Sequence, residues 1–272
     1  MSTTTPRRMR LPLSGVLAIL VIALIVPTAA ASADGGQARA TGGVPGELLP
    51  DLALELTGFR LEKLPNGSAR LRVGSTALNF GDGPFAVRGT RASTDDPTMK
   101  VRQRVSFDDG TTRLRLTGAV MEFEGDGHDH WHLQRFIRLQ LYKRSAPQRV
   151  LGLRKLGFCI IDEELRRPNL PNASPERVFF GQNGCGVPDS LKLTAGISVG
   201  WADIYPADFV LQWIKLPAGF ISGRYRLCGM VDAEEEFDET REGNNWVWHD
   251  LRIDVAAGTV ERIRTGRTDC RP

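Results

Sequence analysis

The sequence predicts an all-β fold, a β-sandwich-like single domain with long irregular loops. Short segments alternate between apolar and polar residues, as in half-buried strands. Gly, Asn and Asp form turn sequences between these segments, for example "PNGS", "GDGP" and "DDGT". No long segment has a clean helical period, so a sandwich or barrel fits better than a wound α/β sheet.

The N-terminal residues resemble an export signal. A basic opening with Arg7 and Arg8 precedes an apolar run from Leu13 to Val26, and small residues follow at Ala31 and Ala33. This pattern predicts a signal peptide over residues 1–33, cut near Ala33, although an uncleaved anchor stays open as an alternative. We therefore expect a secreted or extracytoplasmic protein.

Residues 34–47 are polar and rich in Gly and Ala, which predicts a flexible lead-in to a folded domain over residues 48–272. The formal net charge is +3, and both signs are interspersed along the chain. No basic stripe is visible, so we expect no nucleic-acid partner.

Alternation predicts seven strands in the folded part. In chain order they are 52–64, 69–81, 85–89, 100–107, 112–123, 130–142 and 223–231. The fifth is the clearest, since Leu114 and Leu116 alternate with Arg113 and Arg115. The stretch 165–191 is rich in Pro, Asn and Gly, which predicts a long excursion from the sheets.

Four cysteines, Cys159, Cys185, Cys228 and Cys270, lie in the exported part, where disulfides are expected. Three pairings are possible, and the sequence alone does not choose among them. Pairing of neighbours, Cys159 with Cys185 and Cys228 with Cys270, is the simplest expectation, and buried free thiols are the alternative.

Three of the four histidines lie in the stretch "GDGHDHWHLQ". On a strand, His128, His130 and His132 would project from one face, while Trp131 would point the other way into the packing. Three imidazoles can bind copper or zinc, and three ligands with an open position favour a catalytic site. The alternative is a polar strand face without metal. We expect the fourth, His249, to be structural.

The run from Asp232 to Asn245 is strongly acidic. Carboxylates and amides are suitable calcium ligands, but the spacing does not match an EF-hand loop. A solvated turn between two strands is therefore favoured, and the run could also attract cationic substrates.

Several segments in order resemble the catalytic domain of the lysyl oxidase family. They are the H-x-H-x-H run, "LRKLGFCIIDEE", and "GWADIYPADFVLQW", preceded by "LLPDLAL" and "LNFGDGPFAVRG". The resemblance extends from about Leu48 to His249 and suggests a compact microbial-style member. It implies an exported copper amine oxidase that converts primary amines, peptidyl lysine or small amines, to aldehydes and releases ammonia and hydrogen peroxide.

The resemblance also implies roles for individual residues. His128, His130 and His132 would hold Cu(II), and Lys155 and Tyr205 would form the cofactor lysine tyrosylquinone. A quinone is an electrophile that a deprotonated lysine can attack, so the Lys155 amine must reach the Tyr205 ring. Asp203 and Asp208 flank the tyrosine, and the resemblance favours Asp208 as the general base, buried near copper.

The expected partners are a primary amine and dioxygen, with no stable membrane partner after signal cleavage. Two other functions compete: an extracellular copper-binding β-sandwich without quinone activity, and a zinc hydrolase with a metal-bound water. The presence of both Lys155 and Tyr205 favours the oxidase, because a metal carrier needs neither residue.

Overall fold

A computed structural model describes residues 45–124, 129–145, 149–154, 157–180 and 185–270. Within these ranges the chain forms strands, turns and irregular loops and no helix, which confirms the predicted all-β class. Accordingly, these residues contain no helix with the length and hydropathy to cross a membrane. The predicted signal peptide, 1–33, and most of the lead-in lie outside the described residues.

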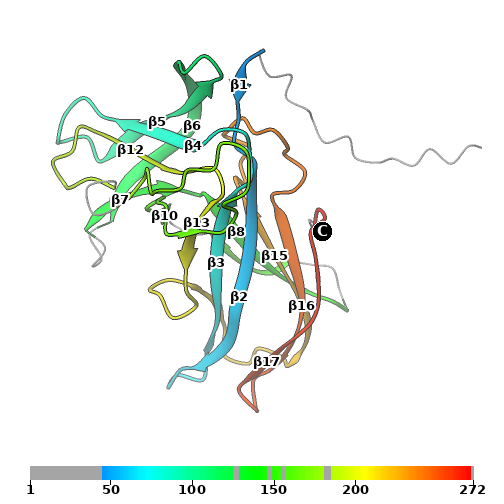
Figure 1. Cartoon of the computed structure of the whole chain (residues 1–272). Helices are drawn as coiled ribbons and strands as arrows, with labels where there is room; N and C mark the ends of the chain where they lie inside the picture. Colours follow the sequence, from blue (N-terminus) through cyan, green and yellow to red (C-terminus); the bar gives the residue numbers. More distant parts are fainter. Residues whose placement is uncertain (1–44, 125–128, 146–148, 155–156, 181–184, 271–272) are drawn as a thin grey trace, which may run out of the picture. The chain divides into compact units, whose positions relative to one another are not determined.

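The largest sheet has seven antiparallel strands (Figure 1). Its strands run in the order β10-β7-β6-β5-β4-β12, and β1 pairs with β5 beside this path. Their bounds are β1 Glu47–Leu48, β4 Phe85–Thr90, β5 Thr98–Phe107, β6 Thr112–Glu124, β7 His130–Gln134, β10 Gly157–Phe158 and β12 Lys192–Ile197.

A second sheet has the order β11-β13-β3-β14, with β2 paired to β3. Its strands are β2 Leu52–Lys63, β3 Ala69–Asn79, β11 Glu164–Leu165, β13 Trp201–Tyr205 and β14 Trp213–Leu216. The third sheet has the order β17-β16-β15-β8-β9. Its strands are β8 Ile137–Lys143, β9 Arg149–Arg154, β15 Gly223–Val231, β16 Trp246–Asp254 and β17 Thr259–Gly266.

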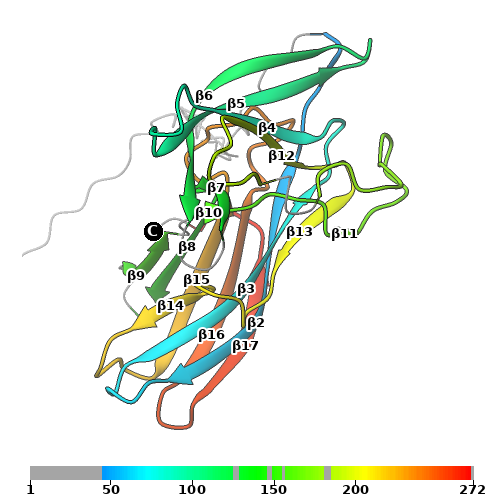
Figure 2. The ribbon, with the colours of Figure 1, turned by 90° about the vertical axis from the view of Figure 1, so that its left-hand side faces the viewer.

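The second and third sheets pack against each other through β2, which contacts β15, β16 and β17 (Figure 2). Leu54 and Leu56 on β2 are almost fully buried and lie over Gly229 of β15. A Cβ atom at Gly229 would lie 2.8 Å from Leu54 Cδ2, so the absence of a side chain permits this close approach. The packed pair of sheets corresponds to the predicted sandwich.

Both disulfides join neighbouring cysteines, Cys159 with Cys185 and Cys228 with Cys270, as the simplest pairing predicted. The predicted excursion over 165–191 is also confirmed, since after β11 the described chain is irregular until β12 begins at Lys192.

The buried carboxylate of Asp162 fastens this irregular stretch to the sheets. It accepts hydrogen bonds from the backbone N–H groups of Val178 and Phe179, at 2.9 and 3.0 Å. It also accepts bonds from the backbone N–H and the hydroxyl of Ser198, at 2.7 and 2.8 Å. The Asp162 carboxylate is 0% exposed, and its four hydrogen bonds offset the free-energy cost of removing it from water.

Candidate metal and quinone site

Two of the predicted metal ligands lie side by side on β7. The ring centroids of His130 and His132 are 4.6 Å apart, and the two imidazoles are tilted by 59°. The strand begins at His130, because Asp129 has a positive φ of 44° that interrupts the extended backbone. The prediction that the histidines share one strand face is confirmed for His130 and His132. His128 lies outside the described residues.

Trp131 points to the other side of β7, as predicted, and is 1% exposed. Its indole N–H donates to the Val187 carbonyl oxygen at 2.9 Å, and its ring packs edge-on against Phe123. A satisfied and buried indole fixes the orientation of the strand, and with it the direction of the two histidines.

The segment that follows Lys155 runs along the histidine strand. Gly157 and Phe158 of β10 pair with Gln134 and Leu133 of β7. A Cβ atom at Gly157 would lie 2.3 Å from the His132 Cβ, so glycine permits this pairing. Lys155 itself lies outside the described residues.

The Cys159–Cys185 disulfide holds this segment in place. The Trp131 backbone N–H donates to the Cys185 carbonyl oxygen at 2.8 Å. The disulfide therefore links the segment after Lys155 to the strand that carries His130 and His132.

Tyr205 is the last residue of β13, and its ring lies over the same segment. Its hydroxyl donates to the Cys159 carbonyl oxygen at 2.7 Å, and its ring meets Phe158 edge-on with centroids 4.3 Å apart. Burial, together with the nearby carboxylates of Asp203 and Glu163, raises the Tyr205 pKa well above its ordinary value of 10.0. The phenol is therefore protonated at neutral pH.

These residues line one pocket with a volume of about 430 Å³. Its polar side chains are His130, His132, Glu163, Asp203 and Tyr205, and Cys159, Ile161, Ile204, Pro206 and Phe209 complete the wall. The structure thus brings together side chains that are up to 79 positions apart, from His130 to Phe209. Such a mixed wall can hold a small ligand with one polar end.

Asp208 was expected to be buried near the metal, and the expected burial is wrong. The residue is exposed in the turn after β13 and does not line the pocket. Asp203 is 1% exposed and lies two residues before Tyr205 on β13, so both side chains project from one strand face into the pocket.

Glu163 is a pocket residue that the sequence-based reasoning missed. It is half-buried, and its carboxylate accepts the Ile204 backbone N–H at 2.7 Å. Burial raises its pKa above the ordinary value of 4.5. The sequence did contain a hint of Glu163. It lies in the acidic end of "FCIIDEE", next to Asp162, whose carboxylate binds the backbone N–H of Ser198.

The donor set fits a copper or zinc ion. Two imidazoles face one open pocket, and the sequence supplies a third histidine two positions before His130. The His132 Nδ1 atom lies 3.8 Å from the Glu124 carboxylate, which accepts a hydrogen bond from Gln134. With a carboxylate near Nδ1, the other ring nitrogen, Nε2, is the candidate metal ligand.

The acidic run differs from the predicted solvated turn. Asp232 and Glu239 are 2% and 0% exposed, and with Glu242 they place carboxylate oxygens within 4.8 Å of one another. Burial raises the pKa of Asp232 to about 7, and it raises that of Glu239 well above 4.5. Three carboxylates this close can bind one cation or share protons.

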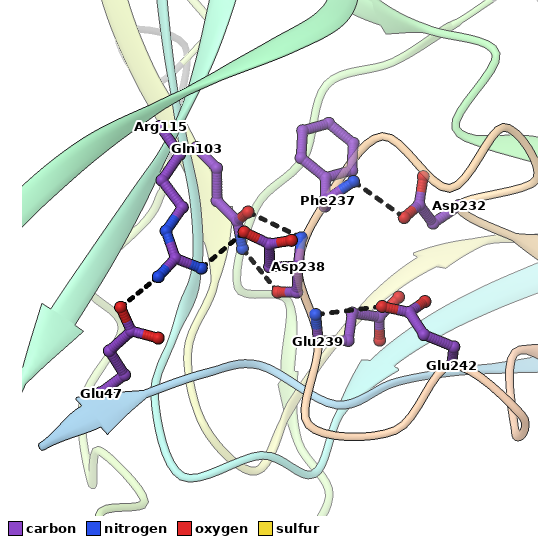
Figure 3. Close-up of polar contacts among 8 residues, drawn as sticks. All are labelled: Glu47, Gln103, Arg115, Asp232, Phe237, Asp238, Glu239 and Glu242. Carbon is purple, nitrogen blue, oxygen red and sulfur yellow. Dashed lines mark hydrogen bonds and ion pairs between the residues drawn. The ribbon is translucent and has the colours of Figure 1, made fainter. Parts of the chain in front are cut away.

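Hydrogen bonds fold the run back against the first sheet (Figure 3). The Gln103 side chain donates to the Asp238 carbonyl oxygen and accepts its backbone N–H, both at 2.8 Å. Arg115 joins Glu47 and Asp238 by ion pairs. Asp232 accepts the Phe237 N–H at 3.1 Å. The run is therefore a structural connection, with exposed carboxylates at Glu234 and Glu235.

His249 lies on β16, outside the pocket lining. It is 4% exposed and its ring packs against Phe59 with centroids 4.9 Å apart. Both ring nitrogens lack a hydrogen-bond partner among the described residues. Burial lowers its pKa from 6.5 to about 4, helped by Arg262 and Arg267, so the ring is neutral at neutral pH.

Comparison with models of known protein families gives no match to this chain, and a search of curated proteins finds no significant match.

Proposed function

We propose that this protein is an exported copper amine oxidase that deaminates primary amines to aldehydes, with release of ammonia and hydrogen peroxide. Its cofactor would be lysine tyrosylquinone, formed from Lys155 and Tyr205. The observation that carries the proposal is the pocket in which His130, His132 and Tyr205 meet. The Tyr205 hydroxyl also bonds to Cys159, four residues after Lys155.

His128, His130 and His132 would hold the copper ion. When bound, copper and the quinone supply the two-electron oxidation of the amine, with dioxygen as the final acceptor. The Glu124 carboxylate, 3.8 Å from the His132 Nδ1, would help to orient that ring. The protein otherwise contributes binding, orientation and proton transfer.

Asp203 is the carboxylate that we propose as general base, in place of Asp208. It is buried and projects into the pocket from the same strand face as Tyr205. Its oxygens would take the proton from the carbon next to the substrate nitrogen. This role requires a carboxylate that faces the pocket, and Asp203 lines it whereas Asp208 does not.

Glu163 would bind the positive charge of an incoming amine before it reacts. Its half-buried carboxylate faces the pocket, while Ile161, Ile204 and Phe209 provide apolar contacts for an alkyl chain. This combination suits a primary amine on an aliphatic arm, such as a lysine side chain or a small diamine. The two disulfides agree with an extracytoplasmic location, where such substrates would be met.

The test uses copper-loaded protein matured in air. A redox-cycling quinone stain and peroxide release from a panel of primary amines should both be positive. Tyr205→Phe should abolish both signals and leave the copper content unchanged. Tyr225→Phe is the matched control, because that buried hydroxyl also donates to a backbone carbonyl, of Ile221 at 2.6 Å.

Two results would contradict the proposal. The first is a negative quinone stain at full copper loading, which would favour a copper-binding module without quinone activity. The second is amine oxidation that survives Tyr205→Phe.

A further inference from the structure

The outward face of the seven-stranded sheet gathers four cations on β4 and β5, namely Arg88, Lys100, Arg102 and Arg104. Arg88 and Arg102 are directly opposite in the strand register. The three β5 cations are exposed and alternate with buried residues, so they share one side of the strand. Among the described residues, none of the four makes an ion pair or a side-chain hydrogen bond.

Two exposed leucines complete this surface, which we call the cationic face. Leu116 pairs with Arg102, and Leu114 pairs with Arg104. They are 82% and 40% exposed. Figure 2 shows β5 and β6 as a long paired ribbon at the top of the view.

The arginines that alternate with these leucines point to the opposite side of β6. Arg113 lies over the Phe107 ring, and Arg115 binds Glu47 and Asp238. The two leucines are thus exposed, with no strand of the described part of the chain over them, while Arg113 and Arg115 make their contacts on the opposite side of β6. A face kept only for solubility would have the reverse arrangement.

The charge on the cationic face calls for an anionic partner. The acidic residues of β6 that share this side lie toward Lys100, since Glu122 pairs with Thr98, whereas Arg102 and Arg104 pair with the two leucines. Exposed leucines between cations gain nothing from a soluble polyanion, but they gain from leaving water at a lipid interface. The combination therefore favours an anionic membrane over a charged polymer.

We propose that the cationic face docks reversibly on an anionic lipid bilayer. Leu114 and Leu116 enter the interfacial region, and the four cations meet the lipid phosphates. This partner differs from the sequence-based expectation of no stable membrane partner. The docking is independent of the oxidase chemistry, because no residue of the cationic face lines the metal and quinone pocket.

The test is co-sedimentation of the exported protein with vesicles. The wild type and all variants have the same N-terminus, namely the one present after export. We expect binding to vesicles that contain phosphatidylglycerol and little binding to pure phosphatidylcholine. Arg102→Glu with Arg104→Glu should weaken binding about tenfold or more, since each basic residue near the surface contributes about a fivefold factor. Leu114→Ser with Leu116→Ser should also weaken it severalfold.

Lys215→Glu is the matched control, because Lys215 is an exposed cation on β14 in another sheet. It should bind like the wild type, and all variants should keep the wild-type circular dichroism spectrum. Equal binding to both vesicle types, or equal loss in the control, would overturn the proposal. Loss with the charge reversals but not with the leucine changes would indicate a soluble polyanion and would also overturn it.

Discussion

Two carboxylates near Tyr205 differ in burial, and this difference predicts their roles. Asp203 is buried in the pocket, and Asp208 is exposed in the following turn. Asp203→Asn should lower kcat for amine oxidation by about 100-fold or more, in the range typical of general bases. Asp208→Asn should change kcat less than threefold, or about 0.6 kcal/mol. Steady-state peroxide assays measure both, and a larger loss with Asp208→Asn would reverse the assignment.

Glu163 should determine how well cationic amines bind. Glu163→Gln removes the charge that faces the pocket, so KM for a diamine should rise about fivefold or more while kcat stays nearly constant. Its exposed neighbour provides the matched control, Glu164→Gln, whose partner is Arg166 outside the pocket. A KM that changes equally in both variants would remove Glu163 from the substrate site.

The sequence predicted metal-binding histidines and the packing of Trp131 because their spacing alternates. It did not choose Asp203, although strand alternation contained the signal, since Asp203 and Tyr205 are two residues apart on β13. The burial of Asp162 and Glu239 was not predictable, because the donors that satisfy them come from distant segments.

At the level of elements, the predicted strand bounds are accurate for strands that have one buried face and one solvent-exposed face. The alternating segment 223–231 is β15 with the same bounds, and 112–123 is β6 within one residue. The predicted strand 130–142 divides into β7 and β8, because Arg135 has a positive φ of 58°.

The strands that were missed have little alternation. Six of the nine residues of β16 are buried in succession, from Trp246 to Leu251, so the period of two is hidden. The short strands β12, β13 and β14 depend on pairing partners that are distant in sequence, and of the three β13 lines the pocket.

The two disulfides should differ in their effect on the site. Replacing Cys159 and Cys185 by Ser should lower the free energy of unfolding by about 2–4 kcal/mol and reduce quinone formation. Replacing Cys228 and Cys270 by Ser should lower stability by a similar amount while the refolded protein keeps its quinone signal. Chemical denaturation and the quinone stain separate the two effects. An unchanged stain in the first variant would show that this disulfide does not organise the pocket.

At the level of the whole molecule, strand order and sheet membership were beyond the sequence. Strand β12 pairs with β4, more than 100 residues earlier, and β1 pairs with β5. The cationic face also forms only when the chain folds. Arg88 comes next to Arg102 through strand pairing, whereas the linear sequence shows mixed charges.

The pH dependence of stability should contain two opposed contributions. The folded pKa of Asp232 is about 7, above its ordinary 3.8, so its contribution is lost as pH rises from about 4 to 7. The folded pKa of His249 is about 4, below 6.5, so its contribution is lost as pH falls through that window.

Variants of these two residues should therefore shift stability in opposite directions with pH. Relative to the wild type, Asp232→Asn should gain thermal stability as pH rises from 4 to 7. His249→Leu should gain as pH falls from 6.5 to 4. Thermal denaturation across this range measures both, and parallel pH profiles for the two variants would contradict the assignment.

If Lys155 and Tyr205 form one cofactor, a covalent bond joins their side chains, and peptide mapping detects it. Copper-loaded protein matured in air should yield, after proteolysis and mass spectrometry, a cross-linked pair of peptides that contain residues 155 and 205. The cross-link should be absent from Tyr205→Phe and from protein kept free of copper, and present in Tyr225→Phe. Recovery of both peptides as separate, unmodified species from fully copper-loaded protein would show that the two residues do not form a cofactor.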